Sequence, residues 1–146
     1  MKKFITLTGI FLGFITITSC NHSTKPIDYG NDGCHYCKMT IVDKIHGAEL
    51  ITEKGKVFKF DATECMLNYI AEDNELERGS FLTNHYDGPA SLISATKATY
   101  LISENFPSPM GAYLTAFENA TSAEKVKAEK GGELYTWEAL RKHLKK

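Results

Sequence analysis

The sequence predicts an α+β fold of two small ββα-type modules, in which antiparallel strands pack with helices. Short apolar runs of strand length alternate with turns rich in Gly, Pro, Asn and Asp, and helical segments follow them. The order of elements recurs in the second half without a recurrence of residue identity. Hydrophobic residues form 42% and charged residues 24% of the chain, which is typical of a globular domain and excludes a disordered or low-complexity chain.

The first residues have the features of a bacterial lipoprotein signal peptide. Basic Lys2 and Lys3 precede an apolar run over residues 4–17, which is shorter than the roughly 20 residues of a membrane span. Ile17-Thr18-Ser19-Cys20 resembles a lipobox, so we expect acylation of Cys20 and a lipid anchor in the membrane. The alternative is an ordinary signal peptide with a cysteine at this place by chance.

The expected organisation is a signal peptide at residues 1–19, a lipidated tether at 20–33 and a domain at 34–146. Within the domain we place the two modules at roughly 34–75 and 80–146. Removal of a signal peptide puts the protein outside the cytoplasm, on the periplasmic side of a membrane. Asn21 is not the aspartate of the inner-membrane retention signal, which favours the outer membrane.

The first module begins with a β-hairpin. Residues 48–52 and 57–60 are predicted strands, and Gly55 lies in the turn between them. A helix is then expected from an Asp61 N-cap, with Glu64 completing a capping box, to about residue 72. Its apolar face is formed by Leu67, Ile70 and Ala71.

The second half is predicted to contain short strands followed by two helices. A turn is expected at 87–89, a constrained loop at 106–111 because of its two prolines, and a helix stop at Gly131-Gly132. Thr136 is the expected N-cap of the last helix. The predicted strands are 81–86, 92–95, 99–102 and 112–117, and the predicted helices are 121–129 and 137–144.

The cysteine count and the net charge restrict the chemistry. The chain has four cysteines, and with Cys20 on lipid the remaining three cannot form a complete disulfide framework. A formal net charge of −1 gives no basic footprint, so we expect no nucleic-acid partner. The sequence contains no nucleophile elbow and no glycine-rich phosphate loop, so we expect a protein that is not an enzyme.

The densest group of reactive residues is Cys34-His35-Tyr36-Cys37-Lys38-Met39, and three interpretations compete for it. Cys34 and Cys37 could form the redox pair of a membrane-tethered thiol-disulfide oxidoreductase, although the residues that follow favour a strand rather than a helix. They could instead belong to a structural zinc site completed by His46 and Cys65.

The third interpretation is a soft-metal site. Thiolate and thioether ligands together select Cu(I). Cys37 and Met39 are two residues apart, so in an extended chain their side chains point to the same side. Met110 lies in the Pro-Met-Gly loop and could close the site from the second half.

At these motifs the chain resembles the NosL family of copper-binding lipoproteins. The resemblance depends on the lipobox at Cys20, the polar tether, Cys34-x-x-Cys37-x-Met39 and Pro109-Met110-Gly111, in this order and over nearly the whole mature chain. It implies a Cu(I) chaperone that passes copper to nitrous oxide reductase or its assembly factors during maturation. Cys37 and Met39 correspond to the family's Cys-x-Met motif and Met110 to its distal methionine, whereas only part of the family has a cysteine at Cys34.

The remaining candidates have alternative roles. Cys65 is expected to be a buried core residue, with a third sulfur ligand or a disulfide partner as alternatives. Met66 and Trp137 are expected in the core. His35 is a metal ligand or a surface residue. We therefore predict a lipid-anchored Cu(I) metallochaperone with Cys37, Met39, Met110 and Cys34 as ligands, where Cys34 is an alternative thiolate or pairs reversibly with Cys37.

Overall fold

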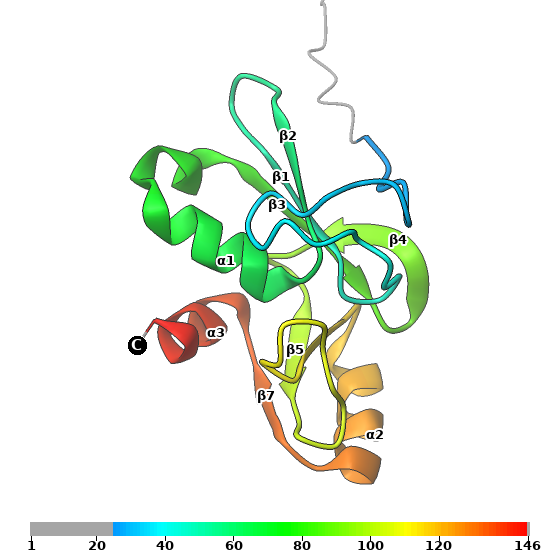
Figure 1. The fold of residues 1–146 in the computed structure, drawn as a ribbon. Coiled ribbons are helices and arrows are strands. Elements are labelled where there is room, and N and C mark those ends of the chain that lie inside the picture. The colour runs from blue at the N-terminus through cyan, green and yellow to red at the C-terminus, as the bar shows by residue number, and fades with distance from the viewer. Residues whose placement is uncertain (1–24, 146) are drawn as a thin grey trace, which may run out of the picture.

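The computed structural model describes residues 25–145, whose strands form two antiparallel sheets (Figure 1). This arrangement with helices confirms the predicted α+β class. The first sheet has the order β2-β1-β3-β4 and contains β1 (Ala48–Ile51), β2 (Val57–Phe60), β3 (Ser80–His85) and β4 (Gly88–Ser94). The second has the order β6-β5-β7 and contains β5 (Thr99–Ile102), β6 (Leu114–Phe117) and β7 (Glu133–Tyr135). The signal peptide and Cys20 lie outside the described residues.

The helical segments are α1 (Thr63–Glu72), the 3-10 helix η1 (Asn74–Arg78), α2 (Ala120–Lys130) and α3 (Trp137–Leu144). Over residues 25–145, none of them has the length and apolar character of a membrane-spanning helix. Helices α1 and α3 lie side by side, while α2 covers the second sheet (Figure 1). The segment before β1 crosses the first sheet next to the start of α1 (Figure 1).

The predicted β1–β2 hairpin is confirmed. Leu50 pairs with Phe58, and Gly55 has the positive φ of 79° that the turn requires. Strand β1 is buried along its whole length because it lies between β2 and β3. Strand β2 is at the edge of the sheet, so one side of its backbone is free to bind another segment.

The predicted start of α1 is wrong by one residue. The N-cap is Ala62, with extended backbone and no side-chain hydrogen bond, and Asp61 is buried instead of capping. No capping box forms because the Glu64 carboxylate accepts a hydrogen bond from Ser108 rather than turning back along the helix. The predicted burial of Leu67 and Ile70 is confirmed, whereas Ala71 is exposed.

In the second half, β5, α2 and α3 confirm the predicted segments, and Thr136 caps α3 as predicted by accepting from the backbone N–H of Ala139. The turn expected at 87–89 is wrong, because Gly88 and Pro89 already belong to β4. Pro89 is tolerated there because β4 is an edge strand. Strand β7 and η1 were not predicted from the sequence.

The division into modules at 34–75 and 80–146 stays a prediction. The boundary between the two hydrogen-bonded sheets does not coincide with the predicted boundary between the modules. Thr83 of β3, in the predicted second module, pairs with Ala48 of β1, in the first. The last helix also packs back on the first sheet, since the rings of Trp137 and Phe81 stack with centroids 5.5 Å apart. The predicted burial of Met66 and Trp137 in this core is confirmed.

Candidate metal centre

The cysteine motif folds into a tight loop. The backbone N–H of Cys34 donates to the carbonyl of Met39 at 2.8 Å, and the N–H of Lys38 donates to the carbonyl of Cys34 at 3.1 Å. Lys38 adopts a φ of 67°, which costs a non-glycine residue about 1 kcal/mol. The extended Cys37–Met39 segment expected from the sequence is therefore wrong, because the chain reverses at Lys38.

The edge strand β2 holds this loop in place. The backbone N–H of His35 donates to the carbonyl of Lys59 at 2.9 Å, and the N–H of Lys59 donates back to Nδ1 of His35 at 3.4 Å. The imidazole ring of His35 also contacts the ring of Phe58 edge-on, with centroids 4.9 Å apart. The Lys59 ammonium donates to Asp32 at 2.5 Å, which fixes the chain just before the loop. His35 thus acts as an anchor of the loop.

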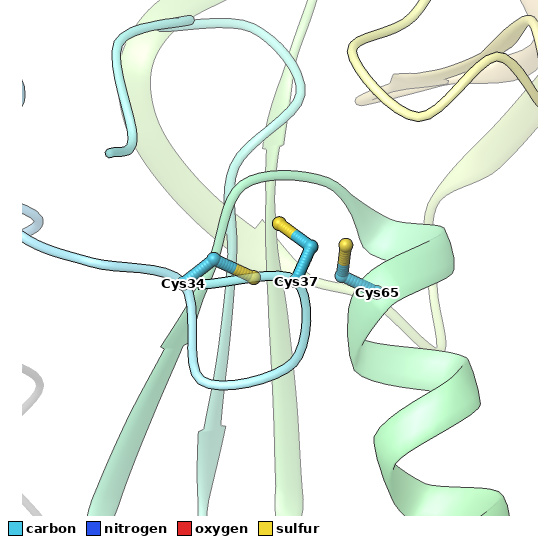
Figure 2. A group of neighbouring side chains, drawn as sticks. All are labelled: Cys34, Cys37 and Cys65. Carbon is cyan, nitrogen blue, oxygen red and sulfur yellow. The ribbon is translucent and has the colours of Figure 1, made fainter. Parts of the chain in front are cut away.

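Three cysteine sulfurs meet between this loop and α1. Cys34 and Cys37 come from the loop, and Cys65 comes from the first turn of the helix (Figure 2). The three sulfurs all lie within 4.8 Å of one another, and none of these cysteines is in a disulfide. Metal–thiolate bonds of about 2.3 Å place the sulfurs of a trigonal site roughly 4 Å apart, so small movements suffice to bind one ion.

The burial of these sulfurs is graded. Cys65 is 0% exposed and Cys34 is 2% exposed, whereas Cys37 is half-buried. Met39, two residues further along the loop, is 46% exposed. The ligand candidates therefore extend from the protein interior to the surface.

The thiols have different acidities. The hydrogen bond from the Cys65 thiol, assisted by backbone N–H groups of the loop and of Asp61, lowers the pKa of Cys34 to about 4 although burial opposes the shift. The same hydrogen bond and burial raise the pKa of Cys65, and burial raises the pKa of Cys37. Cys34 is therefore the most acidic of the three thiols.

Acidic side chains are buried next to the thiols. Burial raises the pKa of Asp61, and the negative charge at Cys34 raises it further. Burial also raises the pKa of Glu64, which precedes Cys65 in the helix. Each additional negative charge in this region is therefore unfavourable.

Met110 lies at the tip of a turn in the loop between β5 and β6. The backbone N–H of Gly111 donates to the carbonyl of Ser108 at 3.0 Å and closes this turn. The Ser108 hydroxyl donates to Glu64 at 2.7 Å, which ties the turn to the start of α1. Met110 is partly buried against the same core that contains Cys65 and Cys34. The ligand roles of Met110 and Met39 stay predictions.

The zinc interpretation does not fit the positions of the histidines. His46 is buried between Asp43, at 3.0 Å from its Nδ1, and Thr115, at 3.1 Å from its Nε2. His85 likewise contacts Ser91 at 2.8 Å. Within residues 25–145, the three cysteines form the one group of three or more Cys, His, Asp and Glu side chains close enough to share an ion.

Sequence reasoning underestimated Cys65. Its burial is as predicted, but its sulfur lies within 4.8 Å of the sulfurs of both loop cysteines, beside which Figure 2 shows it. The odd number of cysteines was the signal for an unusual thiol, but the sequence did not show which one. A metal ligand set of sulfurs alone suits a soft ion of low charge.

An α+β domain in which three thiols lie this close together defines a candidate soft-metal-binding protein. The NosL family model matches residues 27–144, and the chain belongs to the NosL family. It is 27% identical over 150 residues to the copper-binding lipoprotein NosL of Stutzerimonas stutzeri, covering 92% of this chain and 78% of that protein.

The fold is also similar to a solved structure. The crystal structure of the copper chaperone NosL from Shewanella denitrificans superposes with a TM-score of 0.69 at 21% identity. The similarity covers 80% of this chain and 94% of that one. At this level of identity it establishes that the two proteins share a fold.

Proposed function

We propose that this protein is an exported, lipid-anchored chaperone that binds one Cu(I) through sulfur and passes it on. The observation that carries the proposal is the group of three sulfurs within 4.8 Å of one another. Polarisable thiolates and thioethers stabilise a monovalent d¹⁰ ion over harder cations. The names of the two NosL relatives, a copper-binding lipoprotein and a copper chaperone, support copper as the ion.

The proposed ligands are Cys37, Cys34, Met39 and Met110. Cys34 supplies a ready thiolate, and Cys37 is the more accessible cysteine beside it. The exposed Met39 can reach a partner's ligands, so it suits transfer. Copper is the cargo that the protein would bind and pass on, and it keeps its charge of +1 throughout.

The proposed location and recipient follow the family. Cys20 would carry the lipid anchor, in agreement with the lipoprotein from Stutzerimonas stutzeri, and Asn21 favours the outer membrane. The recipient would be nitrous oxide reductase or one of its assembly factors. Delivery would require only ligand exchange, so we propose no catalytic reaction.

A Cu(I) competition titration against a chromophoric chelator tests the function. The full chain in detergent, reduced and anaerobic, carries Cys20→Ser in every variant so that only the clustered thiols remain. We expect the wild-type cluster to bind Cu(I) near 1:1. Cys37→Ser should abolish tight binding, and Met110→Leu should weaken the affinity by one to two orders of magnitude. Met66→Leu is the matched control, because it removes a buried thioether that is not a proposed ligand.

The alternative function is a thiol-disulfide oxidoreductase that cycles Cys34 and Cys37. The low pKa of Cys34 favours it, because a thiolate is the reactive form. However, Cys34 is only 2% exposed, which hinders attack on another protein's disulfide. Failure of the wild-type protein to compete with the chelator would overturn the copper function and leave the redox one.

A further inference from the structure

We propose that Cys65 is the third ligand of a buried resting site for Cu(I), and that copper leaves this site outward through Cys37 and Met39. The proposal rests on the copper function proposed above and describes how the site would control the release of copper. Two overlapping positions would share Cys37. The inner one uses Cys34, Cys37 and Cys65, and the outer one replaces the two buried sulfurs by the thioether of Met39.

The orientation of Cys65 distinguishes a ligand from a core residue. A cysteine that only fills the core directs its sulfur toward apolar side chains. The Cys65 sulfur instead lies within 4.8 Å of both loop sulfurs. Figure 2 shows the three cysteine side chains beside one another where the loop meets the helix.

The origin of Cys65 explains why it would retain the metal. Cys34 and Cys37 belong to one loop, whereas Cys65 belongs to α1. An ion bound to all three links the loop to the helix, so it cannot leave with the loop until its bond to Cys65 breaks. The first turn of a helix also stabilises negative charge on Cys65.

The charge of the complex limits how tightly the third thiolate holds. Two thiolates and one Cu(I) carry −1, and three thiolates carry −2. This extra charge lies beside the buried Asp61 and Glu64. We therefore expect Cys65 to raise the affinity by 10- to 100-fold, which retains copper and still allows release to a partner.

The exit step is a ligand exchange. The copper bonds to Cys65 and Cys34 break as the Met39 thioether bonds to the metal. The Cys65 sulfur takes up a proton from water, and Cys34 keeps its negative charge. Copper remains Cu(I), and no electron is transferred. The exposed fractions of 0% at Cys65 and 46% at Met39 give this exchange its outward direction.

The first test compares affinity with rate in the full chain carrying Cys20→Ser. Cys65→Ser should lower the Cu(I) affinity 10- to 100-fold and speed copper loss to a chelator by a similar factor. Met39→Leu should slow the loss at least tenfold, because the outer position then lacks its thioether. Met66→Leu, the neighbouring residue on α1, should change neither.

The second test keeps Cys65 intact, so it does not depend on the folding of a Cys65 variant. In Met39→Leu/Met110→Leu, X-ray absorption of the Cu(I) form should show three copper–sulfur bonds. Two bonds, or unchanged affinity in a folded Cys65→Ser variant, would overturn the role of Cys65. Failure of the wild-type chain to bind Cu(I) would instead overturn the proposed function itself.

Discussion

The hydroxyl of Ser108 donates a hydrogen bond of 2.7 Å to Oε1 of Glu64, which lies 44 residues earlier in the chain. Glu64 precedes Cys65 in α1, and Ser108 begins the turn that holds Met110. This bond therefore links the turn that holds Met110 to the start of the helix that holds Cys65.

Ser108→Ala should destabilise the protein and weaken copper binding. Among the described residues, Oε2 of Glu64 already has no hydrogen-bond partner, so the substitution removes a further bond from an incompletely paired, buried carboxyl. We expect a loss of about 1–3 kcal/mol in the free energy of unfolding, measured by urea denaturation.

The copper affinity of Ser108→Ala should fall in the same direction as that of Met110→Leu. Ser94→Ala is the control, because its hydroxyl bonds only to Thr96 on the surface and its removal should change stability by less than about 0.5 kcal/mol. Equal stability of both variants would show that the Ser108–Glu64 bond does not hold the turn.

Glu49 should make the protein less stable as the pH rises. It is fully buried in β1, and burial raises its pKa from 4.5 to about 7. Between these two values the folded state keeps a proton that the unfolded state has released, so the free energy of unfolding decreases with rising pH. The shift corresponds to about 3 kcal/mol, present below pH 4.5 and lost above pH 7.

Glu49→Gln should remove this part of the pH dependence. Urea denaturation between pH 4 and pH 8 gives the slope of the unfolding free energy against pH for both proteins. The other titrating groups contribute equally to both slopes, so the difference between the slopes reports Glu49 alone. Parallel curves for the two proteins would mean that Glu49 keeps its ordinary pKa in the folded state.

Local signals in the sequence predicted the elements that local forces determine. Gly55 marks the turn of the β1–β2 hairpin, and Thr136 caps α3, because each effect acts within a few residues. The capping box expected from Asp61 and Glu64 did not form, and the Glu64 carboxylate instead accepts from a distant residue, Ser108. Such a contact has no local signature.

The site was predicted only in part for the same reason. The motif identified Cys34 and Cys37 as neighbours, but it did not show that the chain reverses at Lys38. A glycine would have indicated the positive φ at this position, but lysine does not. The sequence predicted that Cys65 is buried, yet the direction of its sulfur depends on how α1 packs against the loop. Whether Met39 and Met110 bind metal stays a prediction.

His35→Phe tests the anchor of the cysteine loop. Phenylalanine keeps the ring contact with Phe58 but cannot accept the hydrogen bond from the Lys59 N–H. We expect a loss of about 0.5–1.5 kcal/mol in thermal unfolding experiments and a lower Cu(I) affinity, because the loop sulfurs are less well positioned. His143→Phe is the control, since His143 lies in α3, outside the cysteine cluster. A normal affinity in His35→Phe would show that the remaining contacts suffice to position the loop.

Oxidation of the three clustered cysteines should form one disulfide per molecule and leave one free thiol. In the Cys20→Ser chain, diamide takes up two electrons and two protons as two of the three clustered thiols join. We expect thiol titration to find one free thiol per molecule and Cu(I) affinity to fall at least 100-fold until a reductant is added. Prior loading with Cu(I) should protect all three thiols, because each sulfur is then bound to the metal. If the loaded protein loses thiols as fast as the metal-free one, these sulfurs do not hold the ion.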